Sequence, residues 1–394
     1  MRSQTTMRLA WLATHPIQYQ APILREIAKC KDIDLTAIFF SDFSTRGFVD
    51  TGFGRSIEWD TPLLEGYKYE FLPGTGENVQ SIDTFSPRIK GLRERINRDN
   101  YDAILVQGWQ HYGMVKAAWL AKRAGLQVLM RCEATDHVVS STGLKGILRE
   151  AAVRFLLGQI DTCLAIGTHN RNFYLSRGIP LERIGSMPYC VDNNHFQKKA
   201  EETDLSSMRS DLSLADDRPI ILYAGKLTRR KYPDLLLKAY KKLPKPRPYL
   251  IYVGDGELRN SLEETVKEEG FKDVRFVGFQ NQGQLPSYYA LASIFVLPSI
   301  NEPFGLVVNE AMNAQCAIIV TDQVGSSVDL VKSGENGFVI APNNEDLLSE
   351  ALIGALEGNQ SGKMGKNSLK IIENWGIKEN VCGLRKALGL PNGD

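Results

Sequence analysis

Short apolar runs rich in valine, isoleucine and leucine alternate with longer amphipathic segments along this chain. Such runs are typical of strands buried on both faces, and the amphipathic segments of helices that cover a parallel sheet. The first series of predicted elements has strands near 8–14, 35–41, 102–107, 126–131 and 161–166, with helices at 20–30 and 112–124. The second series has strands near 220–225, 249–253, 273–277, 294–297, 317–321 and 337–340. The pattern predicts an α/β protein with two Rossmann-like doubly wound domains.

A polar, charged stretch at 192–218 separates the two series, as expected of an exposed linker that leads into a surface helix. We therefore predict an N-terminal domain over 1–199 and a second domain over 200–375. The tail at 376–394 is predicted to be a helix, and packing back on the N-terminal domain is one of its two alternatives. Since open α/β sheets bind ligands at the carboxyl ends of their strands, we expect a site in a cleft that both domains face.

Composition excludes several classes of function. The 394 residues carry 47 basic and 46 acidic side chains, so no bulk charge attracts nucleic acid, and none is predicted as a partner. No apolar stretch approaches the roughly 18 to 20 residues that span a bilayer, and the N-terminus does not resemble a signal peptide. The six cysteines include no C-x-x-C pair, which argues against disulfides and structural zinc. We expect a cytoplasmic protein.

Metal and nucleophile motifs are absent from the sequence. The single D-x-D, Asp32-Ile33-Asp34, precedes a predicted strand instead of following one, so it is poorly placed to hold a metal diphosphate. The sequence contains no Walker A, G-x-S-x-G or H-E-x-x-H motif, and no G-x-G-x-x-G after the first strand. We predict neither a metal nor a resident cofactor.

The segment 297–314 combines a loop and a helix start. Pro303 and Gly305 delay the helix until Leu306, so 298–305 is predicted as a loop and 306–314 as a helix. The amide N–H groups at the start of such a helix, together with its dipole, favour an anion such as a diphosphate. The predicted donors are Phe304, Gly305, Leu306 and Val307. Ordinary helix capping without a ligand is the alternative.

Two carboxylates belong to this segment and are expected to have different roles. Glu302 lies on the predicted loop and Glu310 one turn into the helix, so they do not form a close acid/base pair unless the turn folds them together. A carboxylate in the position of Glu310 can accept hydrogen bonds from two ribose hydroxyls. A solvated glutamate is the alternative for each.

Glu302-Pro303-Phe304-Gly305 followed by Glu310 is similar to the E-x7-E pattern of retaining GT-B glycosyltransferases, and nearly the whole chain resembles glycosyltransferase family 4 (group 1). Other matches occur in the expected order. They are Gly225-Lys226-Leu227-Thr228-Arg229-Arg230-Lys231, Gly254-Asp255-Gly256-Glu257-Leu258, Pro188-Tyr189-Cys190-Val191-Asp192 with Phe196, Gly278-Phe279, the segment 288–299, Gly325, and Asn336-Gly337-Phe338. The opening Thr14-His15-Pro16-Ile17-Gln18-Tyr19 resembles a branch of the family that begins with H-P-I-Q-Y.

The resemblance assigns roles to residues of the second domain. Lys226, which stands where the family usually has arginine, and Lys231 would neutralise the leaving diphosphate. Glu302 would bind the transferred sugar. Gly225, Gly254 and the backbone at 304–307 would hold the donor, and Glu310 its ribose. The alternative for the lysines is a solvated pair, which we disfavour because neighbouring cations are costly without an anion.

The N-terminal domain carries weaker signals for acceptor binding. His15 and Gln18 could reach the site as donors, although a histidine before proline is as often a turn residue. Arg131 and Glu133 stand where the family often has a histidine, and could bind a sugar hydroxyl or pair with each other. Trp109 could stack on an acceptor sugar or belong to the core. The long insert 42–66 is predicted to recognise the acceptor.

Two basic segments, 88–98 and 145–157, could rest on anionic lipid, but solvated helix faces are the preferred interpretation. This would allow peripheral membrane contact.

The sequence thus predicts transfer of a sugar from a nucleotide-diphosphate-sugar to a hydroxyl acceptor, with retention of configuration implied by the resemblance. Cell-surface polysaccharide or glycolipid synthesis is the expected setting. The alternatives are a small-molecule acceptor, a GT-B sugar-nucleotide epimerase or hydrolase, and a non-catalytic nucleotide-sugar-binding subunit. The nucleotide, the sugar and the linkage are not fixed by these residues.

Overall fold

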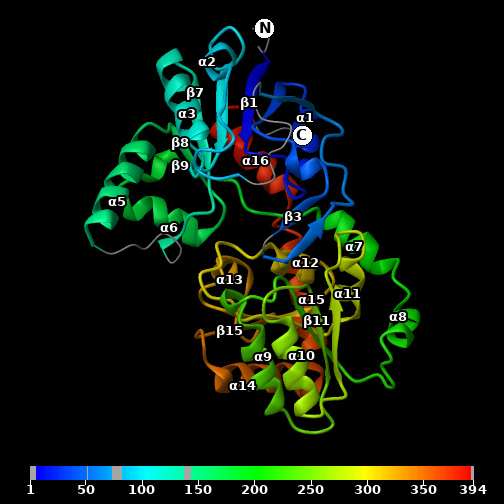
Figure 1. The fold of residues 1–394 in the computed structure, drawn as a ribbon. Coiled ribbons are helices and arrows are strands. Elements are labelled where there is room, and N and C mark those ends of the chain that lie inside the picture. The colour runs from blue at the N-terminus through cyan, green and yellow to red at the C-terminus, as the bar shows by residue number, and fades with distance from the viewer. Residues whose placement is uncertain (1–5, 51, 73–81, 137–142, 392–394) are drawn as a thin grey trace. The chain divides into compact units, whose positions relative to one another are not determined.

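The computed structural model describes residues 6–50, 52–72, 82–136 and 143–391 of the chain. They form two compact units, each built from more than one segment. Unit 1 comprises 1–48, 57–189 and 377–394, and unit 2 comprises 49–56 and 190–376. Each unit is an α/β structure with its own parallel sheet, so the predicted fold class of two Rossmann-like halves is confirmed (Figure 1).

Unit 1 contains a sheet of seven parallel strands in the order β5-β2-β1-β6-β7-β8-β9. Its strands are β1 Met7–Ala13, β2 Ile33–Phe39, β5 Lys68–Phe71, β6 Ala103–Gln107, β7 Gln127–Arg131, β8 Thr162–Ala165 and β9 Ile184–Ser186. Its helices are α1 Ala21–Ala28, α2 Leu92–Arg95, α3 Tyr112–Ala124, α5 Gly143–Gly158, α6 Thr168–Ser176 and α16 Ile377–Ala387, with short 3-10 turns η1 Phe43–Thr45 and η2 Leu181–Arg183. Strand order reverses beside β1, as in a doubly wound sheet.

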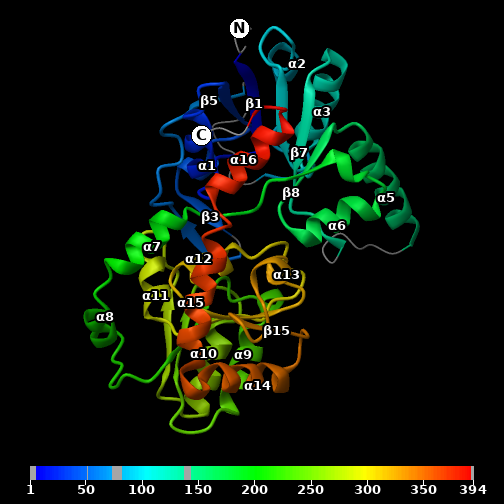
Figure 2. The ribbon, with the colours of Figure 1, turned by 180° about the vertical axis from the view of Figure 1, so that it is seen from behind.

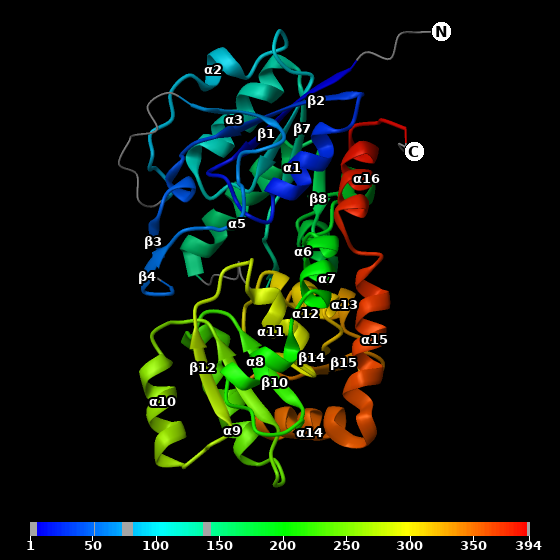
Figure 3. The same cartoon turned by 90° about the vertical axis from the view of Figure 1, so that its right-hand side faces the viewer.

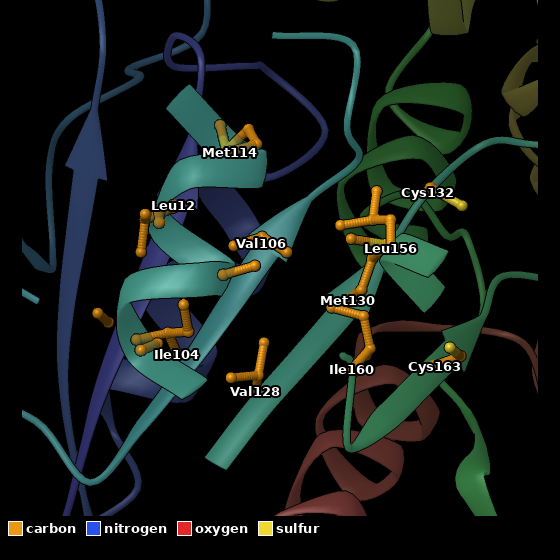
Figure 4. Packing of buried hydrophobic residues seen from close by; sticks show 14 of the residues in the cluster. Leu12, Ile104, Val106, Met114, Val128, Met130, Cys132, Leu156, Ile160 and Cys163 are labelled. Atoms are coloured by element: carbon orange, nitrogen blue, oxygen red, sulfur yellow. The ribbon is translucent and has the colours of Figure 1, made fainter. Parts of the chain in front are cut away.

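The core of unit 1 lies between this sheet and its helices. Every residue of β6 from Ala103 to Val106 is fully buried. Figure 4 shows side chains of β6 and β7 packing with Met114 of α3 and Leu156 of α5. Burial on both faces explains why these strands read as continuous apolar runs in the sequence.

The C-terminal helix α16 belongs to unit 1, although its chain arrives from unit 2. It lies beside α1, as Figure 2 shows for the red and blue helices. The Arg385 guanidinium contacts both carboxylate oxygens of Asp32 at 2.7 and 2.8 Å, and Asn380 donates to the carbonyl of Pro188 at 2.7 Å. Asp32 lies immediately before β2, and its carboxylate is therefore engaged by α16.

Unit 2 contains a sheet of six parallel strands in the order β12-β11-β10-β13-β14-β15. Its strands are β10 Ile220–Ala224, β11 Tyr249–Val253, β12 Val274–Gly278, β13 Ile294–Leu297, β14 Ala317–Thr321 and β15 Gly337–Ile340. Its helices are α7 Asn193–Glu201, α8 Leu205–Asp211, α9 Pro233–Lys241, α10 Arg259–Glu268, α11 Leu285–Leu291, α12 Leu306–Asn313, α13 Ser327–Leu330, α14 Glu345–Leu356 and α15 Gln360–Ile372, with η3 Arg229–Lys231 and η4 Glu357–Asn359. Figure 3 shows α14 and α15 as consecutive orange-to-red helices of this unit.

The two units differ at two places from the predicted division into 1–199 and 200–375. The boundary near 200 lies at residue 190, because α7 packs on α11 and α12 of unit 2. Residues 49–56 also group with unit 2. They contain most of a short two-stranded sheet, β3 Phe48–Asp50 and β4 Arg55–Ile57, within the insert that we predicted to recognise the acceptor.

The predicted strands, and the helices predicted at 20–30, 112–124 and 306–314, are present within two residues of their expected ends. The short strands β3, β4, β5 and β9 were not predicted, since three or four residues carry too little periodicity. Among the described residues, no helix has the length and apolar character needed to cross a membrane.

Candidate functional site

Glycines at the carboxyl ends of β10 and β11 allow two loops of unit 2 to approach closely. Gly254 has a φ of 130°, and a β-carbon there would lie 1.9 Å from the carbonyl oxygen of Gly225. The Gly225 amide donates to the carbonyl of Val253 at 2.9 Å. A side chain at Gly254 would therefore separate these strand ends, on which the predicted donor-binding glycines lie.

Lys231, in η3 after β10, forms an ion pair with Glu302, in the loop after β13. The two side chains are only 13% and 11% exposed, and the Arg230 guanidinium lies 3.6 Å from the same carboxylate. Tyr232 and Asn301, which adjoin this pair, have φ values of 50° and 49°. Non-glycine residues in the left-handed region store backbone strain, and such strain is concentrated at functional sites.

Lys226 pairs with a different carboxylate, that of Asp50 in β3. Its ammonium lies 2.8 and 3.0 Å from the two Asp50 oxygens and 4.9 Å from the centre of the Phe53 ring. Phe53 in turn packs edge-on against Phe279, with ring centres 4.9 Å apart. Both lysines thus have carboxylate partners within unit 2. Our expectation that they would need an external anion was wrong, because these carboxylates supply the compensating charge.

Helix α12 begins at Leu306, with Gly305 as its N-cap residue at a φ of 86°. No side chain caps this end. In the described part of the chain, the amides of Gly305, Leu306 and Val307 have no hydrogen-bond acceptor. Gly305 lies against Glu302, whose Cγ would be 3.4 Å from a β-carbon at that position. The helix start and the Lys231–Glu302 pair therefore form one group.

The backbone amides of residues 325 and 326 bind the loop that carries Glu302. The Gly325 amide donates to the carbonyl of Glu302 at 3.0 Å, and the Ser326 amide donates to that of Phe304 at 2.9 Å. A β-carbon at Gly325 would lie 2.0 Å from the Pro303 carbonyl oxygen. These contacts fix the position of Glu302 and of the start of α12.

Glu310 lies on α12, and its side chain is fully buried. Its carboxylate accepts a hydrogen bond of 2.7 Å from the hydroxyl of Tyr289 in α11. The two glutamates of the E-x7-E pattern thus have separate partners, Lys231 for Glu302 and Tyr289 for Glu310. The predicted contact of Glu310 with a ribose stays a prediction.

In unit 1, His15 and Gln18 follow β1. The Nδ1 atom of His15 lies 3.0 Å from the hydroxyl of Thr14, and its ring packs against Phe43 with centres 4.6 Å apart. Gln18 is 7% exposed, and its side-chain oxygen has no hydrogen-bond partner among the residues described. A buried amide oxygen without a partner is costly, so this atom is available to a ligand or a water.

Arg131 and Glu133, at the end of β7, both contact Tyr189. The Arg131 guanidinium lies 4.4 Å from the centre of the Tyr189 ring and donates to the Pro188 carbonyl, and the Tyr189 hydroxyl donates to Glu133. Arg131 is 1% exposed, whereas Glu133 is exposed. Their roles toward a sugar remain predictions, and Tyr189 was not recognised from the sequence as their common partner.

Trp109 follows β6 and is half-buried. Its side chain is therefore neither fully enclosed in the core nor fully exposed to solvent. Its indole stacks on Phe173 of α6, with centres 5.9 Å apart and an interplanar angle of 17°. The remaining exposed part lines a cavity that also includes His15.

Acid should destabilise unit 1 partly through His15. Burial lowers the pKa of His15 to about 4, below its value of 6.5 in the unfolded chain. The unfolded state therefore binds the proton more tightly, and stability is lost as the pH falls from about 6.5 to 4. Between pH 7 and 4.5, the free energy of unfolding of the His15→Gln variant should fall by about 1 to 2 kcal/mol less than that of the wild type. Urea unfolding at the two pH values measures this difference.

Burial also lowers the pKa of His111, so some acid sensitivity should remain in the His15→Gln variant. Identical pH dependence in the wild type and the variant would show that His15 is not protonated on unfolding in this range.

Known proteins are similar to parts of this chain. The family model described as glycosyl transferases group 1 matches residues 206–373. The N-acetylgalactosamine-N,N'-diacetylbacillosaminyl-diphospho-undecaprenol 4-alpha-N-acetylgalactosaminyltransferase of Campylobacter jejuni is 30% identical over 281 residues, which cover 70% of this chain and 69% of that protein. The chain belongs to the group 1 glycosyltransferases.

Solved structures share the fold of this group 1 glycosyltransferase. The structure of Anabaena Alr3699/HepE in complex with UDP matches with a TM-score of 0.72 and 17% identity, covering 97% of this chain and 100% of that one. The fold is therefore GT-B. The chain spans about half the length of several curated relatives. An uncharacterized glycosyltransferase of Methanocaldococcus jannaschii, for example, is 29% identical over 46% of this chain and 42% of its own length.

Proposed function

We propose that the protein is a retaining, family 4 glycosyltransferase that transfers a sugar from a nucleotide-diphosphate-sugar to a hydroxyl acceptor. The observation that carries the proposal is the group formed by Lys231, Glu302 and the open start of α12. It combines a cation and unsatisfied amide donors, which bind a diphosphate, with a carboxylate, which binds sugar hydroxyls. Membership of the group 1 family supports the same assignment.

In the proposed reaction, the bond between the anomeric carbon and the diphosphate oxygen breaks, and a bond to the acceptor oxygen forms. The diphosphate leaves with its electron pair and takes up the acceptor's proton, so no separate base is required. Lys231 and the amides of Gly305, Leu306 and Val307 stabilise the charge that develops on the leaving oxygen. The transition state resembles an oxocarbenium ion, as in glycoside hydrolysis.

In the proposed function, donor binding also involves the ion pair between Lys226 and Asp50. A phosphate that pairs with Lys226 must replace the Asp50 carboxylate, which now lies 2.8 Å from the ammonium. The pair is partly solvent-accessible, with 35% and 21% exposed side chains, so its separation costs little. The donor would thus separate the Asp50 carboxylate from Lys226.

UDP is the proposed nucleotide, because the structural relative from Anabaena was solved with it. The nucleotide-sugar is a substrate, and the proposal includes no resident metal or cofactor. The acceptor belongs to polysaccharide or glycolipid synthesis, or is a small molecule. Acceptor residues are proposed in unit 1 at His15, Gln18, Trp109, Arg131 and Glu133.

Calorimetric titration with UDP tests the donor site. We expect UDP to bind the wild type, to bind Lys226→Ala about tenfold more weakly, and to bind Asp50→Asn several-fold more tightly, because the amide no longer competes for the ammonium. Opposite effects of the two variants are the key result. If both weaken UDP, or neither changes it, Lys226 does not bind the phosphate.

Transfer itself is tested with radiolabelled UDP-sugars. Product that contains the sugar joined to an acceptor hydroxyl supports the transferase. Donor consumption that yields only free sugar or an epimer supports the hydrolase or epimerase, and UDP binding without any turnover supports the non-catalytic subunit.

A further inference from the structure

Unit 1 contains a cavity of about 890 Å³ that starts at the carboxyl ends of β1 and β6 and continues between α3 and α5. The volume lies in the range of pockets that bind small-molecule ligands. Figure 1 shows α3 and α5 in cyan to green beside strands β7 to β9. The residues that line this cavity are separate from the Lys231–Glu302 group, which belongs to unit 2.

The walls between the two helices are mainly apolar. Val115 and Trp119 line the cavity from α3, one turn apart, and Val153 and Leu156 line it from α5, three residues apart. Positions separated by three or four residues share one helix face, so two apolar stripes oppose each other here. Phe155, which is 72% exposed, adds a large ring at the rim.

In the described structure, Val115 and Trp119 of α3 and the Phe155 ring are accessible, whereas Val153 and Leu156 are buried, at 5% and 9% exposed. Trp119 is 47% exposed and Val115 is 37% exposed, although both line the cavity. Large apolar groups gathered in one concave, accessible surface mark a binding site more often than single exposed residues do. A bare saccharide would gain little from them, since its hydroxyls need hydrogen-bonding partners.

Polar groups also line the cavity. Thr14, His15, Gln110 and His111 lie at the end that meets the sheet, and the lining further includes Asp83, Thr84 and Gln159. His15 is neutral at pH 7, because burial lowers its pKa to about 4, so its imidazole can exchange hydrogen bonds with a hydroxyl. Arg149, on the α5 wall, has no ion-pair partner within the described ranges. The lining therefore suits a ligand with a polar head, a hydrocarbon chain and an anionic group.

We propose that this cavity binds the hydrocarbon chain of a lipid-linked acceptor, whose hydroxyl-bearing head lies at the His15 end. The inference rests on the proposed transferase function and names the class of its acceptor. The apolar stripes of α3 and α5 contribute chain affinity, and Arg149 binds an anionic group between head and chain.

Alkyl glucosides of increasing length, kept below micelle formation, test the chain site by calorimetry. The series is methyl, hexyl, heptyl and octyl glucoside. Binding should strengthen about threefold for each methylene that enters the cavity, with a negative heat-capacity change. Affinity that does not depend on chain length, with methyl glucoside binding as well as octyl glucoside, overturns the proposal in favour of a saccharide acceptor.

Two adjacent alanines of α5 provide a matched pair of variants. Ala152 lines the cavity and Ala151 does not, although both are exposed and helical. Ala152→Trp should fill the space and weaken octyl glucoside at least tenfold, whereas Ala151→Trp should leave its affinity unchanged. Equal effects overturn the proposal. Phe155→Ser, at an exposed position, provides a second test that does not threaten folding, and should weaken octyl glucoside about threefold.

Titration of the same preparation with UDP separates the two proposals. UDP binding without chain-dependent glucoside binding removes the cavity inference and leaves the transferase proposal standing. Chain-dependent binding of glucosides without any nucleotide binding supports the cavity inference and removes the transferase proposal. Octyl phosphate, compared with octyl glucoside in Arg149→Ala, tests the anionic contact, and its affinity should fall about fivefold in the variant.

Discussion

Replacing Lys231 with alanine is expected to lower the rate of donor turnover by about 10²- to 10³-fold, the usual cost of removing one donor to a developing negative charge. The variant should also be less stable by about 2 to 3 kcal/mol. Its Glu302 partner is only 11% exposed and would lose its ion pair, but the Arg230 guanidinium, 3.6 Å away, partly compensates. Single-turnover release of UDP and urea unfolding measure the two effects.

Two other variants separate catalysis from folding. Lys238→Ala removes a lysine of α9 that is 61% exposed and paired with Asp234, and should change neither quantity. Lys231→Arg keeps the charge and should restore most of the stability, but a planar guanidinium changes the geometry at the phosphate. Full turnover in Lys231→Ala would remove this lysine from the mechanism.

Gly325→Ala is expected to have the second large effect, although residue 325 is not proposed to contact the donor. The added β-carbon would lie 2.0 Å from the Pro303 carbonyl oxygen and 2.9 Å from the Cα of Phe304. Both are backbone atoms, so the loop that carries Glu302 must move. We expect UDP affinity to fall at least tenfold and stability to fall by about 1 to 3 kcal/mol, the usual cost of overpacking.

Gly158→Ala is the matched control for this substitution. Its β-carbon would have nothing within 4 Å, and its φ lies outside the left-handed region, so neither UDP affinity nor stability should decline. Normal UDP binding by Gly325→Ala would mean that the loop tolerates a shift, and that its geometry does not position the donor.

Most of the sheet architecture could be predicted, because strands buried on both faces leave continuous apolar runs in the sequence. The runs at 249–253, 294–297, 317–321 and 337–340 coincide with β11, β13, β14 and β15. The start of α12 was predicted for a local reason, namely that Pro303 and Gly305 interrupt the helix. Local rules of this kind need no knowledge of distant contacts.

The partners of the site residues could not be predicted, since they depend on tertiary contacts. Asp50 meets Lys226 across 176 positions of sequence, and Glu302 meets Lys231 across 71. Nothing in the insert 42–66 distinguishes Asp50 from its other acidic residues. The same limit applies to Tyr189, which joins Arg131 and Glu133 only after the chain has folded.

The placement of α16 has a consequence for biosynthesis. Ser186 ends β9, the last strand of unit 1, yet Gly383 of α16 packs so closely that a β-carbon would lie 1.8 Å from the Ser186 carbonyl oxygen. A ribosome adds about 5 to 20 residues per second, so roughly 10 to 40 seconds separate the two elements during translation. Throughout that interval, α16 is not yet available to cover the surface against which Leu384 is buried in the folded protein.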